Sequence, residues 1–360
     1  MKHNDILAAM ISPLCSWYEK NKRQLPWREN RDPYRGWVSE IMLQQTRVEA
    51  ALPYYKRFLE ALPTVEALAK APEELILKLW EGLGYYSRVR NMQKAAVTVV
   101  EEYNGKFPAD RKLLSRLSGI GEYTAGAVAS IAFNLPEPAV DGNVLRVVAR
   151  LLNDDTDIML PAFKKEVQAE LSKVYPLASD CGDLTQAIME LGALICIPGG
   201  VPRCDACPLA HLCKAREEGR EQLLPVRKVK KEKKLFNRTV FVMEHGGKVA
   251  LVKRPKGGVL AGMWEFPAAE GHLKAKEQET WLESFGGAER ISELAEHRHV
   301  FTHLVWNMKS YYVEAKKADE AFFWVTPEEL LKTIALPSAI KPFLQAYLEK
   351  KKSQEKKGLR

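Results

Sequence analysis

The spacing of apolar residues changes once along this chain, near residue 235. Before that point apolar residues recur at helical spacing, as in the first predicted helix at residues 6–15. After it the period becomes two, and residues 239–243 and 248–252 predict a β-hairpin around a turn at residues 245–247. A chain of 360 residues is also long for one domain. The sequence therefore predicts an all-α domain followed by a smaller α+β domain.

The helical part divides into short predicted segments. Helices are expected over residues 6–15, 37–52, 65–68, 72–80, 90–103, 123–133, 144–151, 163–174 and 183–194. Further strands are expected at residues 299–305 and 310–313, and residues 350–360 predict a basic, disordered tail. No run of about 18 apolar residues occurs, and the apolar run near the N-terminus is short and lacks a cleavage site. We therefore expect a cytoplasmic protein.

The net charge of +8 suggests a polyanionic partner, although an ordinary basic protein with a solvated lysine surface has the same charge. Part of the charge is concentrated in residues 217–234, which contain Pro225 and show no apolar period. The basic residues there are Arg227, Lys228, Lys230, Lys231, Lys233 and Lys234. We expect a linker that can also lie along DNA.

Four of the six cysteines lie within 18 residues of one another and are spaced Cys-x7-Cys-x2-Cys-x5-Cys. They are Cys196, Cys204, Cys207 and Cys213. This spacing is typical of a metal site in a reducing compartment rather than of a secreted disulfide framework. Four thiolates suit a zinc ion or an iron–sulfur cluster equally well.

Two features around residues 117–144 suggest chemistry on a molecule that carries a phosphate. Gly119 and Gly121 form a tight turn before a helix, and its free backbone N–H groups suit a phosphate. Asp141 follows that helix as a lone carboxylate between Val140 and Gly142. On its own, Asp141 is better explained as the N-cap of the next helix, at residues 144–151.

Other candidate residues each have an ordinary structural explanation as well. Glu40 is expected in the first turn of a helix, where a solvated carboxylate complements the helix dipole, but burial beside Trp37 would make it a proton donor. Gln186 and Glu190 share a helix face and either contact a base edge or form an exposed polar stripe. The remaining candidates are Arg23, Trp27 and Arg28, which suit a planar base, and Tyr85, which suits a wedge between stacked bases.

The segments Leu117–Ala125 and Val140–Val144 resemble the helix–hairpin–helix and the catalytic aspartate segment of the DNA glycosylase superfamily that includes endonuclease III. The rest of the chain narrows the resemblance to adenine DNA glycosylases of the MutY type. The resemblance implies that Glu40 protonates adenine, that Asp141 stabilises the sugar cation, and that Tyr123 and Asn143 orient them. In relatives that also cut the strand, a lysine occupies position 123.

The same resemblance assigns roles to the other candidates. It implies an adenine pocket at Arg23, Trp27, Arg28, Gln186 and Glu190. It implies DNA contacts by Gln45, Tyr85, Gly119 and Gly121, and contacts to 8-oxoguanine by Thr46, Leu83, Phe301, Thr302 and His303. It also implies a [4Fe–4S] cluster on the four cysteines, although the family's usual first spacing is six residues and this chain has seven.

Residues 235–345 resemble a Nudix domain without the glutamate-rich Nudix box, and Thr302 stands where the family usually has serine. We expect this domain to recognise 8-oxoguanine without hydrolysing a nucleotide. The expected domains are 1–216, with a six-helix module at about residues 28–135, then the linker, the Nudix-like domain and the tail at 346–360.

The expected function is that of a monofunctional adenine DNA glycosylase. Its partner would be double-stranded DNA with adenine opposite 8-oxoguanine or guanine, and we expect a monomer that acts at the bacterial nucleoid. The alternatives are a bifunctional glycosylase and lyase like endonuclease III, and a DNA-binding protein without catalysis.

Overall fold

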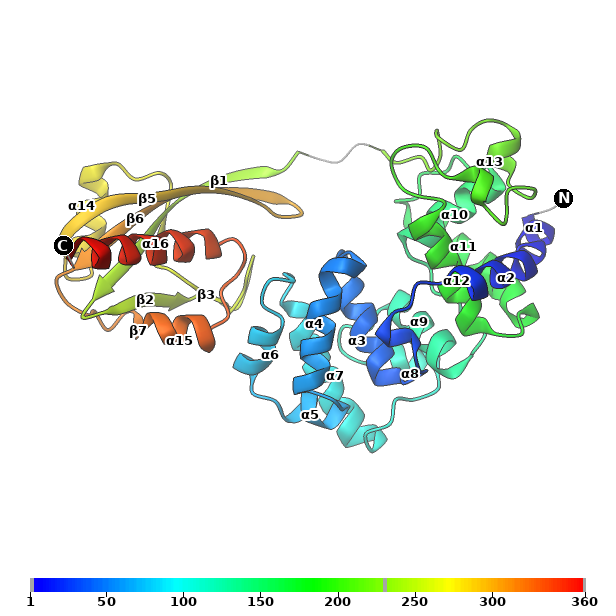
Figure 1. The fold of residues 1–360 in the computed structure, drawn as a ribbon, viewed down its shortest axis with the longest axis horizontal. Coiled ribbons are helices and arrows are strands. Elements are labelled where there is room, and N and C mark those ends of the chain that lie inside the picture. Colours follow the sequence, from blue (N-terminus) through cyan, green and yellow to red (C-terminus); the bar gives the residue numbers. More distant parts are fainter. Residues whose placement is uncertain (1–2, 229–231, 359–360) are drawn as a thin grey trace. The chain divides into compact units, whose positions relative to one another are not determined.

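A computed structural model describes residues 3–228 and 232–358, which form two compact units (Figure 1). The first unit comprises residues up to 70 and residues 91–229, and the second comprises residues 71–90 and those from 230 onward. Lys230 and Lys231 of the expected basic linker lie outside the described residues. Within the described part of the chain, no helix is both long and apolar enough to cross a membrane.

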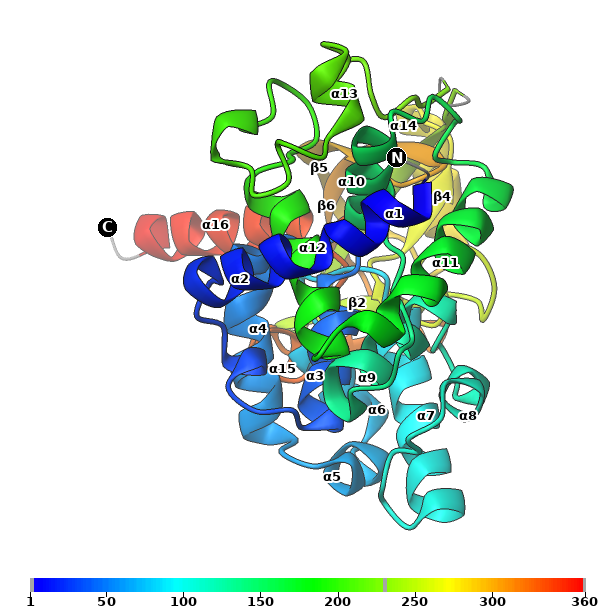
Figure 2. The same ribbon diagram turned by 90° about the vertical axis from the view of Figure 1, so that its right-hand side faces the viewer.

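The first unit is helical. Its elements are α1 (His3–Ala9), α2 (Ile11–Asn21), η1 (Pro26–Arg28), α3 (Pro33–Leu43), α4 (Val48–Ala61), α5 (Val65–Lys70), α7 (Ser87–Tyr103, from Asn91), α8 (Arg111–Arg116), α9 (Glu122–Phe133), α10 (Gly142–Leu152), α11 (Pro161–Val174), η2 (Tyr175–Leu177), α12 (Cys181–Leu194), η3 (Cys204–Ala206) and α13 (Lys214–Glu217). Helix α12 packs against α2, α9 and α10 (Figure 2).

Aspartate residues fix the starts of several of these helices. Asp32, Asp110, Asp141 and Asp180 each precede a helix and accept a hydrogen bond from a backbone N–H of its first turn. Such a cap typically contributes about 1 kcal/mol. These four caps therefore set where α3, α8, α10 and α12 begin.

Two of the predicted helices are divided differently in the structure. The helix expected over residues 37–52 is two helices, because α3 ends at Leu43 and Gln45 takes a left-handed backbone conformation with φ of 60°. Residues 44–47 therefore lie between the two helices and do not continue the helix that carries Glu40. The helix expected over residues 6–15 is likewise divided, into α1 and α2.

The second unit holds a mixed sheet with the strand order β3-β2-β1-β6-β5, in which β4 also pairs with β1 and β7 with β2. Strands β1 and β6 are parallel and the other pairs are antiparallel. The elements are α6 (Glu73–Leu79), β1 (Lys234–His245), β2 (Lys248–Lys253), β3 (Trp264–Glu265), β4 (Ala268–Glu270), α14 (Ala275–Glu283), β5 (Ala288–Val300), β6 (Leu304–Ala315), β7 (Phe323–Val325), α15 (Pro327–Lys332) and α16 (Lys341–Gly358).

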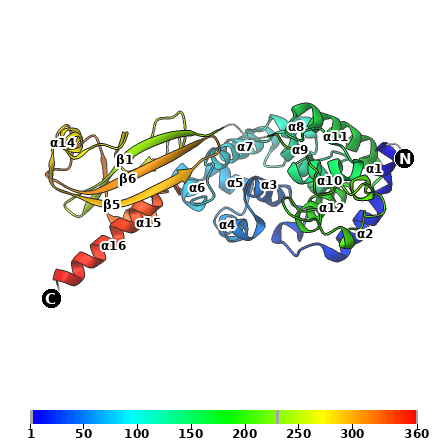
Figure 3. The ribbon, with the colours of Figure 1, turned by 90° about the horizontal axis from the view of Figure 1, so that it is seen from above.

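Apolar residues cover both faces of this sheet. Val240 and Val242 of β1 belong to a core with Phe343 and Tyr347 of α16, whereas Phe241 between them packs in a second core with α14 (Figure 3). The alternation along β1 confirms the predicted period of two and the predicted hairpin with β2.

Two expectations for this unit are wrong. Residues 299–305 are not one strand, because β5 ends at Val300 and β6 begins at Leu304, which leaves Phe301-Thr302-His303 as the loop between them. The tail expected to be disordered is helical through Gly358, because Phe343 and Tyr347 anchor α16 in the core.

Candidate active site

A cavity of about 1040 Å³ opens in the helical unit and gathers most of the predicted site residues. Its walls come from α3, the turn after it, the glycine hairpin before α9, the start of α10, and α12. The four predicted catalytic residues, Glu40, Tyr123, Asp141 and Asn143, all line it.

Glu40 lies in α3 and is only 9% exposed. The expectation that Glu40 lies in the first helical turn is wrong. Asp32 caps the helix, so that α3 begins at Pro33, seven residues before Glu40. Burial raises the pKa of Glu40 from 4.5 to about 7, and the negative charge of Asp141 also raises it. A substantial fraction of Glu40 is therefore protonated near neutral pH, as a general acid requires.

Tyr123 supports Glu40 from the second position of α9. Its hydroxyl donates a hydrogen bond to Oε2 of Glu40 at 2.5 Å, which opposes the rise in the pKa of that carboxyl. Burial and the neighbouring Glu40 raise the pKa of Tyr123 well above 10. Tyr123 thus stays a hydrogen-bond donor across the pH range in which Glu40 titrates.

Asp141 is both the helix cap and a wall of the cavity. Its Oδ1 accepts from the backbone N–H groups of Asn143 and Val144 at 2.9 and 2.8 Å, and its Oδ2 accepts from Asn143 Nδ2 at 2.7 Å. Burial raises the pKa of Asp141, while these hydrogen bonds oppose the rise. The hydrogen bonds by which Asp141 caps α10 therefore also hold its carboxylate in the wall of the cavity.

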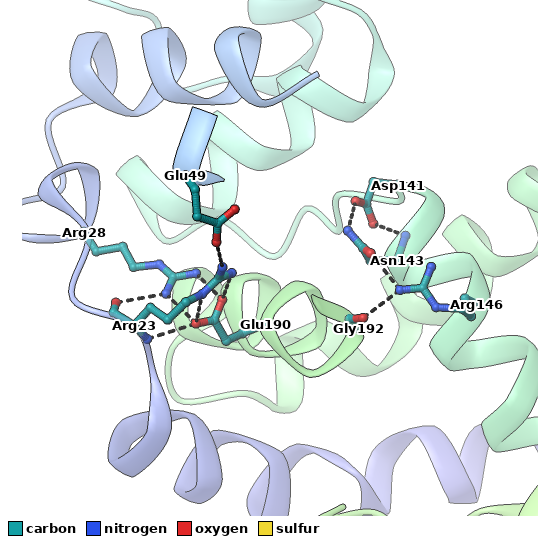
Figure 4. A network of polar contacts seen from close by, with 8 residues as sticks. All are labelled: Arg23, Arg28, Glu49, Asp141, Asn143, Arg146, Glu190 and Gly192. Atoms are coloured by element: carbon teal, nitrogen blue, oxygen red, sulfur yellow. Dashed lines mark hydrogen bonds and ion pairs between the residues drawn. The ribbon is translucent and has the colours of Figure 1, made fainter. Parts of the chain in front are cut away.

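A chain of hydrogen bonds runs from Asp141 to the Cys196 carbonyl. Figure 4 shows the part of it that joins Asp141, Asn143, Arg146 and Gly192. Arg146 donates to Asn143 Oδ1 at 2.8 Å and to the Gly192 carbonyl at 2.7 Å, and Asn143 donates to Asp141. Nε of Arg146 donates to the Cys196 carbonyl at 2.7 Å. Arg146 is 3% exposed and was not predicted as a functional residue. The available signal was the presence of two arginines, Arg146 and Arg150, in the largely apolar helix 142–152.

An ionic cluster of Arg23, Arg28 and Glu190 lies in the wall of the cavity (Figure 4). The side chain of Glu190 is 1% exposed and accepts hydrogen bonds from Arg23 at 2.8 Å and Arg28 at 2.9 Å. Burial alone would raise the pKa of Glu190, but these hydrogen bonds outweigh it and lower the pKa to about 2. Glu190 is therefore ionised at neutral pH and accepts hydrogen bonds as a carboxylate. Gln186 also lines the cavity, and Trp27 is buried beside Tyr55 with ring centroids 5.1 Å apart.

The predicted DNA contacts within this unit lie around the same cavity. Gln45, Thr46, Gly119 and Gly121 all line it. A Cβ on Gly119, which has φ of 75°, would come within 2.7 Å of Cβ of Asn91. The hairpin therefore requires glycine at position 119.

The four cysteines line a second, small cavity of about 30 Å³. Arg150 donates to Sγ of Cys196 at 3.2 Å, and its carbonyl accepts from Sγ of Cys213 at 3.4 Å. Within residues 3–228 and 232–358, no three His, Cys, Asp or Glu side chains are placed to hold a single metal ion. The four cysteines therefore share one cavity, but their side chains are not arranged around a single ion.

The remaining predicted contacts lie in the second unit. Tyr85 is 47% exposed, and its hydroxyl lies 2.5 Å from Oγ1 of Thr302. Thr302 and His303 are exposed and Phe301 is partly buried, in the loop between β5 and β6. Leu83 precedes Tyr85 in the loop that follows α6. This unit therefore brings Tyr85 next to one of the three predicted loop residues.

Comparisons with known proteins agree with this architecture. Residues 38–177 match the model for HhH-GPD superfamily base excision DNA repair proteins, and residues 239–346 match that for the NUDIX domain. A thermostable thymine-DNA glycosylase has 27% identity and a TM-score of 0.53, over 60% of this chain and 98% of that one. A trapped covalent intermediate of endonuclease III with DNA has 26% identity and a TM-score of 0.51, over 61% and 99%.

The adenine DNA glycosylase of Mus musculus is 35% identical over 97% of this chain and 80% of its own length. The match thus extends through the helical unit and the Nudix-like unit together. With that extent of identity, the chain belongs to the adenine DNA glycosylase family.

Proposed function

We propose that this protein hydrolyses the N-glycosidic bond of adenine paired with 8-oxoguanine or guanine in duplex DNA. The observation that carries the proposal is the pairing of Glu40, whose pKa lies at about 7, with Asp141 in one cavity. A carboxylic acid and a carboxylate on either side of a sugar bond are the groups that glycoside cleavage uses.

Each residue then has a defined role. Adenine inside a duplex is out of reach, so it must be flipped into the cavity. Glu40 donates its proton to N7 of the base, which makes adenine a leaving group. Asp141 stabilises the positive charge that develops on the sugar, electrostatically or through a transient bond. Water then adds to the sugar, and the proton that it releases restores the protonated carboxyl of Glu40.

The surrounding polar residues support this reaction without taking part in proton transfer. Glu190 stays ionised at neutral pH and, with Arg23, offers acceptor and donor atoms for the edge of a base. Tyr123 and Asn143 hold the two carboxyl groups by direct hydrogen bonds. Position 123 carries no amine, so the enzyme lacks at this position the nucleophile that a Schiff base to the sugar requires.

We also propose that the four cysteines hold a [4Fe–4S] cluster. Thiolates are the ligands that such clusters take, and all four side chains line one cavity. When bound, the cluster would link the ends of the segment Cys196–Cys213 through four iron–thiolate bonds. Arg146 donates hydrogen bonds both to the Cys196 carbonyl and to Asn143. A well-ordered segment Cys196–Cys213 would therefore help to hold Asn143, and through it Asp141, in position.

The second unit is proposed to recognise the opposite base. Thr302 offers a hydroxyl in an exposed loop next to Tyr85, and a hydroxyl can donate to or accept from a base edge. Because the Nudix box is absent from the sequence, we assign this unit to recognition rather than to nucleotide hydrolysis. One monomer supplies both units.

The test is a base-release assay on four duplexes that carry adenine opposite 8-oxoguanine, guanine or thymine, or thymine glycol opposite adenine. The proposal predicts release of adenine from the first two, little release from the A·T and thymine glycol duplexes, and no strand cleavage before alkali is added. Release of thymine glycol, together with a borohydride-trapped complex, would instead support the bifunctional alternative. Duplex binding without any base release would refute both.

A further inference from the structure

Residues 71–90 belong to the same compact unit as the Nudix-like domain. This segment carries α6 and the loop Gly82–Tyr85, to which the wedge and Leu83 were assigned. The structure therefore places the expected wedge in the unit that was assigned to lesion recognition, and the contacts that fix it there lie at both ends of the loop.

Glu81 makes the contacts at the first end, directly before Gly82. Its Oε1 accepts a hydrogen bond from the backbone N–H of Leu336 at 3.0 Å and lies 3.4 Å from Nζ of Lys341. Its Oε2 lies 2.9 Å from Nζ of Lys78, which also donates to the Ile334 carbonyl at 3.0 Å. The side chain of Glu81 is 14% exposed, so these contacts are largely shielded from water.

Arg90 makes the contacts on the other side of the loop, from the first turn of α7. It donates to the Ala261 carbonyl at 2.7 Å and to the Gly262 carbonyl at 3.3 Å, and it forms an ion pair with Glu73. Both ends of the loop are therefore tied to residues of the Nudix-like domain.

The loop itself has a backbone that needs such support. Gly82 and Gly84 have φ of 108° and 71°, and Tyr85 also takes a positive φ of 48°, which is uncommon for a residue with a side chain. Residues held in such conformations depend on the surrounding structure. Within the loop, Trp80 Nε1 and Arg88 donate to the Gly84 carbonyl at 3.1 and 3.3 Å. At the tip, the Tyr85 hydroxyl forms a short hydrogen bond with Thr302.

We propose that Glu81 is a positioning residue for opposite-base selectivity, because it fixes the loop that presents Tyr85 beside Thr302. This proposal rests on the function proposed above. Glu81 touches neither reacting base and acts through the loop. Its loss should therefore reduce the preference for adenine opposite 8-oxoguanine over adenine opposite guanine, while the Glu40 and Asp141 chemistry remains intact.

The experiment compares single-turnover rates of adenine release from A·8-oxoguanine and A·G duplexes for wild type, Glu81→Ala and Glu81→Gln. We expect the ratio of the two rates to fall about tenfold in Glu81→Ala, a magnitude typical of a coupling between two sites. The fall should be smaller in Glu81→Gln, whose amide oxygen can still accept from Leu336. Glu328→Gln is the control, since Glu328 is 74% exposed and pairs only at the surface with Lys332.

A second arm separates positioning from general stability. In a Tyr85→Ala background, Glu81→Ala should lower the ratio no further, because the residue through which it acts is gone. The proposal is overturned if the ratio stays within twofold of wild type, if both rates fall equally, or if the two substitutions are additive. If Glu81→Ala does not fold, Glu81→Gln decides: it loses the ion pairs with Lys78 and Lys341, so its ratio should still fall more than twofold, and a smaller fall would overturn the proposal. A wild-type enzyme that releases no adenine would refute the proposed function itself.

Discussion

Replacing Tyr123 with phenylalanine should move the pH dependence of adenine release to higher pH. Burial raises the pKa of Glu40 to about 7, and the hydrogen bond from Tyr123 keeps it from rising further. Phenylalanine keeps the ring and removes only the donor. The ionised form of Glu40 would then lose its stabilising partner, whereas the protonated form would lose less.

The expected size of the effect follows from the contact. A hydrogen bond to a charged group contributes about 1.5–3 kcal/mol, and about 1.4 kcal/mol corresponds to one pKa unit. The pKa of Glu40 should therefore rise by about one to two units in Tyr123→Phe. Since the reaction requires the protonated carboxyl, the rate falls as pH rises through this pKa. The midpoint should shift from about 7 to about 8–9.

The assay is single-turnover adenine release with enzyme in excess, over a pH series that spans both midpoints. Tyr175→Phe is the control, because Tyr175 is a buried tyrosine of the same unit whose hydroxyl is hydrogen-bonded to Thr185 instead of a carboxyl. Its midpoint should equal that of wild type. A midpoint in Tyr123→Phe that stays near 7 or moves lower would refute the role of Glu40 as the titrating acid.

Three further predictions follow from the same geometry. Glu40→Gln should raise the thermal stability more at about pH 8 than at about pH 5, because Glu40 contributes stability below its ordinary pKa and loses it as pH rises through about 7. A rise from 4.5 to about 7 corresponds to on the order of 3 kcal/mol, and equal melting shifts at both pH values would contradict it. Arg146→Met should slow adenine release by about 100-fold, because Asn143 loses its partner and Asp141 shifts. Duplex binding, measured by fluorescence anisotropy, should stay unchanged, and an unaltered rate would count against this network. Tyr123→Lys should place an amine at the sugar and produce a borohydride-trapped complex with DNA, which wild type should not form.

Much of the geometry of the candidate site could be predicted because its local sequence leaves few choices. Trp37, Val38 and Ile41 are apolar neighbours of Glu40, and all three are buried in the structure. Gly119 is required where φ is positive and the backbone approaches Asn91. In both cases the physical constraint lies within a few residues of the functional group.

What the sequence did not reveal depends on contacts between distant segments. The break after α3 contains neither glycine nor proline, and Gln45 takes its left-handed conformation in the context of the fold. Arg146 meets Cys196 across 50 residues of sequence, so no local pattern indicated their contact. The start of α3, by contrast, has a local signal: Asp32 is a capping residue, and Pro33 after it suits the first position of a helix.

In the second unit as well, some features have a local sequence signal and others depend on contacts between distant segments. The apolar positions Phe343 and Tyr347 lie four residues apart, and this spacing could have identified α16 despite its basic composition. Glu244 accepts hydrogen bonds from Tyr312 and Tyr347 and pairs with Lys351, so α16 is also held by a carboxylate from β1. That contact joins residues about a hundred positions apart and had no counterpart in the local sequence.

The most direct test of the central claim is the single-turnover rate of adenine release by Glu40→Gln on a duplex with adenine opposite 8-oxoguanine. Glu166→Gln, an exposed carboxylate of α11, is the control and should match wild type. Because the amide cannot donate an acidic proton, the account predicts that Glu40→Gln releases adenine at least about 100-fold more slowly while binding the duplex normally. A rate within a few-fold of wild type would contradict the assignment of Glu40 as the acid.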